Sequence, residues 1–258
     1  MYRYVNIRGE RIAFRKKGRG RVVLMLHGNR SSSRSMEPLM EPLSEKATIY
    51  APDMSGFGES TYHHRREAVA DYAEDMAAFL EVLDLREVLV IGWSFGGAVA
   101  MELAKLTERV ESMVLLSSMG PEGIAFPSIV STADKYRGLD RAEAKRERAK
   151  DMLAESLFDG DLPEAYLHLV EEAVAQQNGL DVYFAMLRYR LADARDIPTL
   201  IIHGLDDRVV AYEDASRLSE FYPNSRLKAL PGGHFLIYND CEAVEREIAT
   251  FMDETAKK

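Results

Sequence analysis

Cysteine is almost absent from this sequence of 258 residues, in which Cys241 is the only one. A single cysteine cannot form an internal disulfide bond and cannot supply a cluster of thiolate metal ligands. The N-terminus has no apolar segment of the signal-peptide kind, and no apolar run approaches the ~20 residues that span a bilayer. We therefore expect a cytoplasmic protein that has no membrane partner, no metal site and no cofactor.

An excess of positive charge is also lacking. The chain has 33 Lys and Arg against 42 Asp and Glu, so its net charge at neutral pH is −9. This balance argues against nucleic acid and anionic membranes as partners. The adjacent His63 and His64 stand in a polar stretch with two arginines, which favours solvated side chains over metal ligands. The hydrophobic share of 47% is typical of a soluble globular protein.

Apolar runs that end in polar loops alternate along the chain with stretches of helical periodicity. After an N-terminal hairpin over residues 2–16, the sequence predicts strands at 22–26, 47–51, 87–91, 110–116, 199–202 and 226–230. It predicts helices at 36–46, 67–83, 95–106, 213–221 and 241–254. We therefore expect an α/β fold, in which helices flank both faces of a mostly parallel sheet.

The alternation is interrupted between residues 120 and 196. This stretch shows no convincing strand but three helical segments, at 142–158, 163–177 and 182–194. We interpret it as a helical cap insertion. Residues 1–119 and 197–258 then form the core of the fold.

A serine stands at a tight turn between a predicted strand and a predicted helix. Ser94 lies between Gly92 and Gly96 in the pattern Gly-x-Ser-x-Gly. A strand that reverses abruptly into a helix strains its corner residue, and larger side chains beside it would collide. The corner hydroxyl is left exposed at the helix N-terminus, where a forming oxyanion would be stabilised. The alternative, an ordinary helix N-cap serine, does not explain the residues that follow later strands.

Two further polar residues follow late strands. Asp207 comes after the strand at 199–202, and His234 comes after the strand at 226–230. A serine hydroxyl becomes nucleophilic when an imidazole accepts its proton and a carboxylate fixes the imidazole tautomer. The order Ser, Asp, His is the one expected on such a sheet. Asp206 competes for the carboxylate role, but the Gly-x-x-Asp spacing that begins at Gly204 favours Asp207.

These motifs together resemble those of α/β-hydrolase-fold serine hydrolases of the carboxylesterase kind. The resemblance covers nearly the whole chain, and the insertion is similar to that family's cap. The matching segments are His27-Gly28-Asn29, residues 53–60, residues 92–97, residues 203–207 and Gly233-His234. The resemblance implies that Ser94 is the nucleophile, His234 the general base and then acid, and Asp207 the orienting carboxylate. It places the oxyanion hole at the backbone N–H groups of Asn29 and Phe95.

Some positions depart from the family pattern or resemble other branches of it. Asn239 and Cys241 stand where the family often has an acidic residue and a proline, which leaves the start of the last helix open. Asn29 is similar to the halide-binding asparagine of haloalkane dehalogenases. Those enzymes and the epoxide hydrolases use an aspartate nucleophile, so Ser94 argues against both. His27 and His203, each before a glycine at a strand end, are interpreted as structural.

Aromatic residues predict an apolar pocket above the serine. We expect Trp93, Phe126 and Phe235 to line it and a small to medium hydrophobic ester to fill it. The sequence thus predicts hydrolysis of carboxylic esters through an acyl-enzyme. Lactone hydrolysis, C–C bond hydrolysis in a diketone and perhydrolysis would use the same triad. A ligand receptor with vestigial activity is an alternative of another class, and the oligomeric state stays open.

Overall fold

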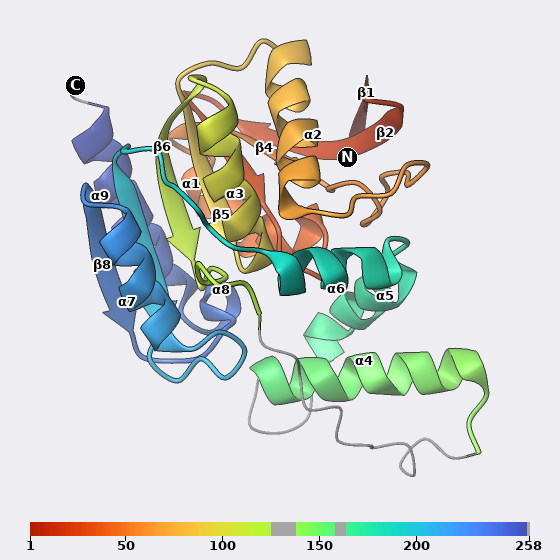
Figure 1. The fold of residues 1–258 in the computed structure, drawn as a ribbon. Coiled ribbons are helices and arrows are strands. Elements are labelled where there is room, and N and C mark those ends of the chain that lie inside the picture. Colours follow the sequence, from red (N-terminus) through yellow and green to blue (C-terminus); the bar gives the residue numbers. More distant parts are fainter. Residues whose placement is uncertain (125–137, 158–163, 257–258) are drawn as a thin grey trace.

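An eight-stranded sheet forms the centre of the computed structural model, which describes residues 1–124, 138–157 and 164–256 (Figure 1). The strand order is β1-β2-β4-β3-β5-β6-β7-β8. The β1–β2 and β2–β4 pairs are antiparallel and the other pairs are parallel. The strands are β1 (Arg3–Ile7), β2 (Glu10–Gly18), β3 (Arg21–Leu26), β4 (Ala47–Pro52), β5 (Val88–Trp93), β6 (Val110–Leu116), β7 (Thr199–Gly204) and β8 (Ser225–Leu230). The mostly parallel sheet expected from the sequence is confirmed.

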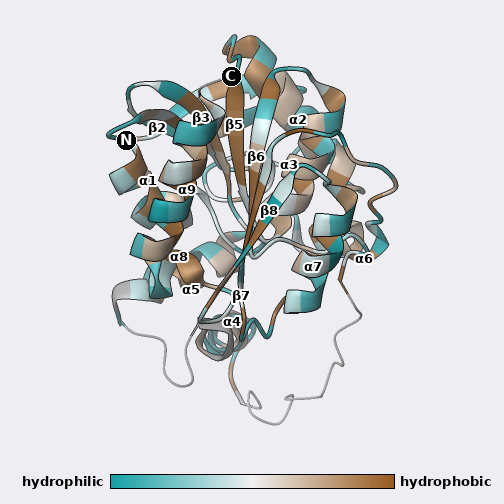
Figure 2. Ribbon diagram, turned by 90° about the vertical axis from the view of Figure 1, so that its left-hand side faces the viewer, coloured by the Kyte–Doolittle hydropathy of each residue, from teal (hydrophilic) through white to brown (hydrophobic). Residues whose placement is uncertain are grey.

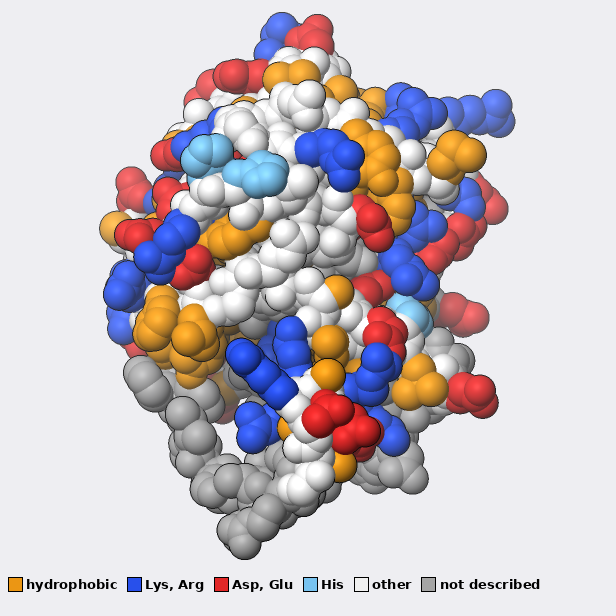
Figure 3. All heavy atoms as spheres, turned by 90° about the vertical axis from the view of Figure 1, so that its right-hand side faces the viewer, with side chains coloured by type: hydrophobic (Ala, Val, Ile, Leu, Met, Phe, Trp, Pro, Cys, Tyr) orange, Lys and Arg blue, Asp and Glu red, His pale blue; other side chains and the backbone are white. Residues whose placement is uncertain are grey.

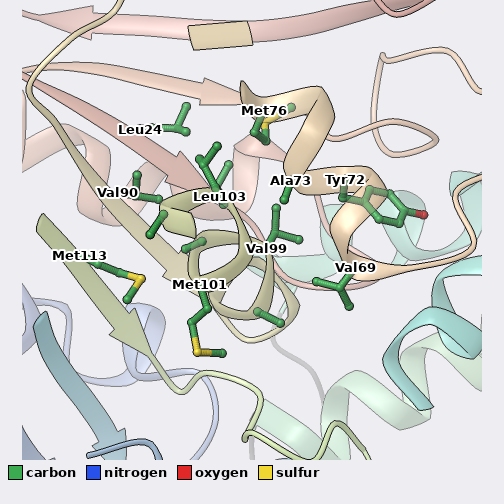
Figure 4. Packing of buried hydrophobic residues seen from close by; sticks show 14 of the residues in the cluster. Leu24, Val69, Tyr72, Ala73, Met76, Val90, Val99, Met101, Leu103 and Met113 are labelled. Atoms are coloured by element: carbon green, nitrogen blue, oxygen red, sulfur yellow. The ribbon is translucent and has the colours of Figure 1, made fainter. Parts of the chain in front are cut away.

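Helices cover both faces of the sheet (Figure 2). They are α1 (Glu37–Leu43) and α9 (Cys241–Thr255) on one face, and α2 (Val69–Val82), α3 (Phe95–Leu106) and α7 (Tyr212–Phe221) on the other. Successive side chains of a strand point to opposite faces. Met25 therefore packs with residues of α1 and α9, whereas Leu24 packs with residues of α2 and α3. Figure 4 shows this second cluster, with Leu24 and Val90 facing α3. Burial on both faces explains why these strands read as continuous apolar runs.

The sequence does not predict two short helices, because neither is long enough to show helical periodicity. They are η1 (Ser33–Met36) and α8 (Leu236–Asn239). The Ser32 hydroxyl accepts a hydrogen bond from the backbone N–H of Arg34 and so caps the first of them. The last helix begins at Cys241 as predicted, and the Asp240 carboxylate caps it by accepting from the Ala243 N–H. This cap supplies the helix start that a proline often provides.

The segment between β6 and β7 contains α4 (Arg141–Leu157), η2 (Glu164–Tyr166), α5 (Leu167–Ala175) and α6 (Gly179–Arg188). Figure 1 shows α4 beyond the carboxyl ends of β6 and β8. The last of these helices ends earlier than predicted, because Leu191 N–H donates to the Pro121 carbonyl instead of continuing the helix. In the described part of the chain, no helix is long and apolar enough to cross a lipid bilayer.

Gly96 allows α3 to approach β3 closely. A Cβ atom at this position would lie 2.2 Å from the carbonyl oxygen of Leu26, which is backbone and cannot yield without moving the helix. We expect Gly96→Ala to lower the free energy of unfolding by roughly 1–3 kcal/mol or more. Gly233→Ala is the matched control, because its added Cβ meets nothing closer than 3.7 Å. Urea unfolding of both variants measures the difference, and equal stabilities would contradict the packing argument.

Candidate active site

Ser94 occupies the sharp turn between β5 and α3 that the glycine pattern predicts. Its backbone has φ 55° and ψ −118°, a conformation that costs free energy for any residue with a side chain. The turn is fixed from both sides. The Ser94 N–H donates to the Leu116 carbonyl at 3.0 Å, and the Ser94 carbonyl accepts from the N–H groups of Gly97 and Met119. The surrounding hydrogen bonds therefore hold the strained residue in place.

The side chains of Ser94, His234 and Asp207 meet at the carboxyl edge of the sheet. His234 Nε2 lies 3.0 Å from Ser94 Oγ, and His234 Nδ1 lies 2.8 Å from Asp207 Oδ2. Both His234 and Asp207 are buried. These distances suit a serine hydroxyl that donates to an imidazole and an imidazole N–H that donates to a carboxylate. The structure thus brings together the three residues that the sequence placed after separate strands.

Asp207 is the carboxylate in contact with His234, whereas its neighbour Asp206 is exposed. Asp207 Oδ1 accepts from the backbone N–H groups of Val209 and Val210, both at 2.8 Å. Burial by itself raises the pKa of Asp207, but hydrogen bonds from His203 and His234 outweigh it. The pKa of Asp207 is thereby held well below its usual range, so the carboxylate stays ionised beside the imidazole.

His203 and His27 are both buried and both hydrogen-bond to backbone groups. His203 Nε2 donates to the Val210 carbonyl at 2.9 Å, and His27 Nε2 accepts from the Met54 N–H at 3.1 Å. His203 has a second contact that the sequence did not predict, since its Nε2 also lies 3.3 Å from Asp207 Oδ2. Two imidazoles therefore point at one carboxylate oxygen, and one of them comes from the strand that precedes it.

Residues 29–35, which we call the Asn29 loop, follow β3 beside the serine. The backbone reaches Ser94 at Gly28, where an added Cβ would lie 3.2 Å from the Ser94 Cβ. The loop is tied down by Asp53, whose Oδ1 accepts from the Ser33 N–H at 2.7 Å. Within the described residues, no hydrogen bond uses the backbone N–H of Asn29 or of Phe95. Neither amide therefore has a protein acceptor among these residues.

Trp93 and Phe235 pack against each other, with ring centroids 5.0 Å apart, and both are buried. The indole N–H of Trp93 donates to the carbonyl of His234 at 3.2 Å. The structure thus gives these rings a role that the sequence did not predict, which is to support the turn that carries His234. Their contact with substrate stays a prediction, and Phe126 lies outside the described residues.

Potential metal ligands and surface charges away from Ser94 were predicted to be solvated rather than clustered. Among residues 1–124, 138–157 and 164–256, no three His, Cys, Asp or Glu side chains are grouped as metal ligands would be. His63 and His64 are exposed, and His64 Nδ1 lies 3.2 Å from Glu10 Oε1. On the side of α5 and α6, acidic and basic side chains are interspersed (Figure 3), with pairs such as Arg65 and Asp181.

Glu172 of α5 is a buried carboxyl group beside the Asn29 loop. Its Oε2 accepts from the Ser35 hydroxyl at 3.1 Å, and its Oε1 lies 3.6 Å from Nε of Arg34. Burial raises the pKa of Glu172 and the nearby Asp53 adds to the rise, while hydrogen bonds from Ser32 and Ser35 and the charge of Arg34 oppose it. The net shift is upward.

A raised pKa in the folded state predicts how stability depends on pH. The contribution of Glu172 is fully present below the pKa of the unfolded state, about 4.3, and is lost as the pH rises through the higher folded-state value. We expect the stability of the natural chain relative to Glu172→Gln to fall between pH 4 and pH 8. Urea unfolding of both proteins across this range measures it. A relative stability that rises with pH would show that the ionised carboxylate is the favoured form.

Comparison with known proteins agrees with this architecture. A profile of the α/β hydrolase fold family matches residues 21–240. The 2-hydroxymuconate semialdehyde hydrolase of Pseudomonas putida is 28% identical over 272 residues, covering 95% of this chain and 92% of that protein. The 2-hydroxy-6-oxo-2,4-heptadienoate hydrolase of Pseudomonas putida is 30% identical over 229 residues, covering 81% and 80%. An esterase from Exiguobacterium antarcticum has the same fold, with a TM-score of 0.82, 22% identity and coverage of 98% and 100%. The chain therefore belongs to the α/β-hydrolase fold family of hydrolases.

Proposed function

We propose that this chain is a serine hydrolase that cleaves carboxylic esters of small to medium hydrophobic substrates through an acyl-enzyme. The observation that supports the proposal is the hydrogen-bonded series from Ser94 through His234 to Asp207. His234 takes the hydroxyl proton as Ser94 Oγ attacks the ester carbonyl carbon. The ionised Asp207 holds the imidazole in the required tautomer and stabilises the imidazolium that forms.

The negative charge of the tetrahedral intermediate needs hydrogen-bond donors beside Ser94. The N–H groups of Asn29 and Phe95 are the donors we propose, because neither has another partner within the described residues. His234 then gives its proton to the leaving alkoxide, and the ester C–O bond breaks. A water molecule, deprotonated by the same imidazole, attacks the acyl-enzyme and releases the carboxylic acid.

A series of p-nitrophenyl esters with acyl chains from acetate to dodecanoate tests the proposal. We expect turnover that depends on Ser94 and peaks at short to medium chain lengths, because an apolar pocket of limited size discriminates by methylene groups. Hydrolysis that is equally fast in Ser94→Ala would contradict the assignment of the nucleophile.

Hydrolysis of a C–C bond next to a ketone is the second candidate. The observation that favours it is the similarity to relatives named for a semialdehyde and an oxo-dienoate rather than for an ester. The same serine and imidazole can attack a ketone carbonyl, after which a carbanion rather than an alkoxide leaves and takes up a proton. A vinylogous diketone measured beside the esters decides between the two. A kcat/KM for the diketone at least a hundredfold above that of the best ester would favour the second candidate.

A further inference from the structure

The last turn of α5 and the residue that follows the helix contact the two ends of the Asn29 loop. Glu172 lies within α5, and Gln176 is its C-cap residue. Gln176 Nε2 donates to Asn29 Oδ1 at 3.1 Å, and Glu172 Oε2 accepts from the Ser35 hydroxyl at 3.1 Å. The segment inserted between β6 and β7 therefore contacts the loop that carries the proposed oxyanion donor.

The turn that follows α5 is anchored to the core of the fold, which gives Gln176 a fixed base. The Gln177 N–H donates to the Gly56 carbonyl at 2.8 Å. Asn178 is buried, and its Nδ2 donates to the Ser55 carbonyl at 3.1 Å and to the Tyr72 hydroxyl at 3.2 Å. Gln176 Nε2 also donates to Asn178 Oδ1 at 2.5 Å. Asn178, which is fixed by the core, thus fixes in turn the Gln176 amide group that bonds to Asn29.

Asn29 is fixed through its side-chain oxygen. Besides the bond from Gln176, Oδ1 accepts from the backbone N–H of Arg30 at 2.9 Å. Arg30 has a positive φ of 55°, which is unfavourable without such support. Because the side chain of Asn29 is tied both to α5 and to the next peptide, the peptide group that carries the Asn29 N–H has little freedom to turn.

We propose that Gln176, supported by Glu172, is a positioning residue that holds the Asn29 N–H in the direction needed to stabilise the oxyanion. The proposal rests on the proposed function of the Asn29 amide. Neither Gln176 nor Glu172 touches the reacting atoms. Their role is to make the oxyanion hole depend on α5, so that the hole is complete only when the inserted segment is docked on the core.

A double-mutant cycle between Gln176 and Asn29 tests the proposal. Gln176→Met keeps the side-chain length but removes the donor, and Asn29→Ala removes the acceptor but keeps the backbone N–H. We expect each single change to lower kcat for a p-nitrophenyl ester about tenfold, with KM changed less than twofold, because the lost bond matters in the transition state. The double variant is expected to lose no more than Asn29→Ala alone, because Gln176 then has no acceptor on residue 29 to lose.

Inhibition by a boronic acid distinguishes a positioning role from a purely structural one. Phenylboronic acid forms a tetrahedral adduct on a reactive serine and places an oxygen in the oxyanion hole. We expect its inhibition constant to rise about tenfold in Gln176→Met, in step with kcat. Glu171→Gln is the matched control on the same helix, because Glu171 is exposed and pairs with Arg146 instead of the loop. It should leave both values unchanged.

The outcomes separate this proposal from the proposed function. Losses that multiply in the double variant, or a boronic acid affinity that stays unchanged in Gln176→Met, overturn the positioning role while Ser94-dependent turnover by the natural chain stands. Absence of any Ser94-dependent turnover overturns both. If Gln176→Met unfolds at a lower temperature than the natural chain, Glu172→Met provides the second test. Its kcat should fall with KM preserved, because the change removes the acceptor of the Ser35 hydroxyl at the other end of the loop.

Discussion

Ser94→Ala should lower kcat for ester hydrolysis by a factor on the order of 10⁵–10⁶ and leave the fold unchanged. The reaction needs the serine oxygen as its nucleophile, and the remaining donors and imidazole have no atom to activate in its place. Alanine adopts the strained backbone of this turn no less readily than serine does, so stability should not change. Steady-state kinetics with p-nitrophenyl butyrate measures the loss, and thermal unfolding measures the stability.

Ser219→Ala is the control for this change. Ser219 lies on α7, away from the site, and its hydroxyl donates only to the Ser216 carbonyl within the described residues. Its activity should equal that of the natural chain. A Ser94→Ala protein that retains more than about one hundredth of the natural kcat would contradict the account, since no other nucleophile is assigned.

Asp207→Asn should lower kcat by about 10⁴-fold. The asparagine keeps the shape of the side chain but loses the charge that stabilises the imidazolium, and its amide can hold the wrong tautomer of His234. Asp206→Asn is a matched control one residue away, because Asp206 is exposed and does not bond to His234 within the described residues. Equal losses in the two variants, measured with the same ester, would show that the carboxylate assignment is wrong.

The features that the sequence predicts correctly are those with local causes. The strands between the helices follow from apolar runs, and the turn at Ser94 follows from two glycines whose absent side chains make room for neighbouring backbone. The choice of Asp207 over Asp206 followed from spacing along a single turn, and the structure places Asp207 against His234. Each of these inferences needed only residues that are close in sequence.

The features that the sequence does not reveal depend on contacts between distant segments. Gln176 and Asn29 are 147 residues apart, and no periodicity in α5 indicates that its Glu172 faces a serine-rich loop. The second imidazole at Asp207 depends on the geometry of the turn after β7. The bond from the Trp93 indole N–H to the His234 carbonyl joins residues 141 positions apart. These roles arise only from contacts that form when the chain is folded.

Labelling with a fluorophosphonate, followed by mass spectrometry of the digested protein, tests the central claim most directly. The reagent reacts with a serine oxygen only when a neighbouring base makes it nucleophilic. We predict a single adduct on the peptide that contains Ser94, its absence in Ser94→Ala, and labelling slowed at least a thousandfold in His234→Ala. An adduct on a different residue, or undiminished labelling of Ser94 without the imidazole, would contradict the account.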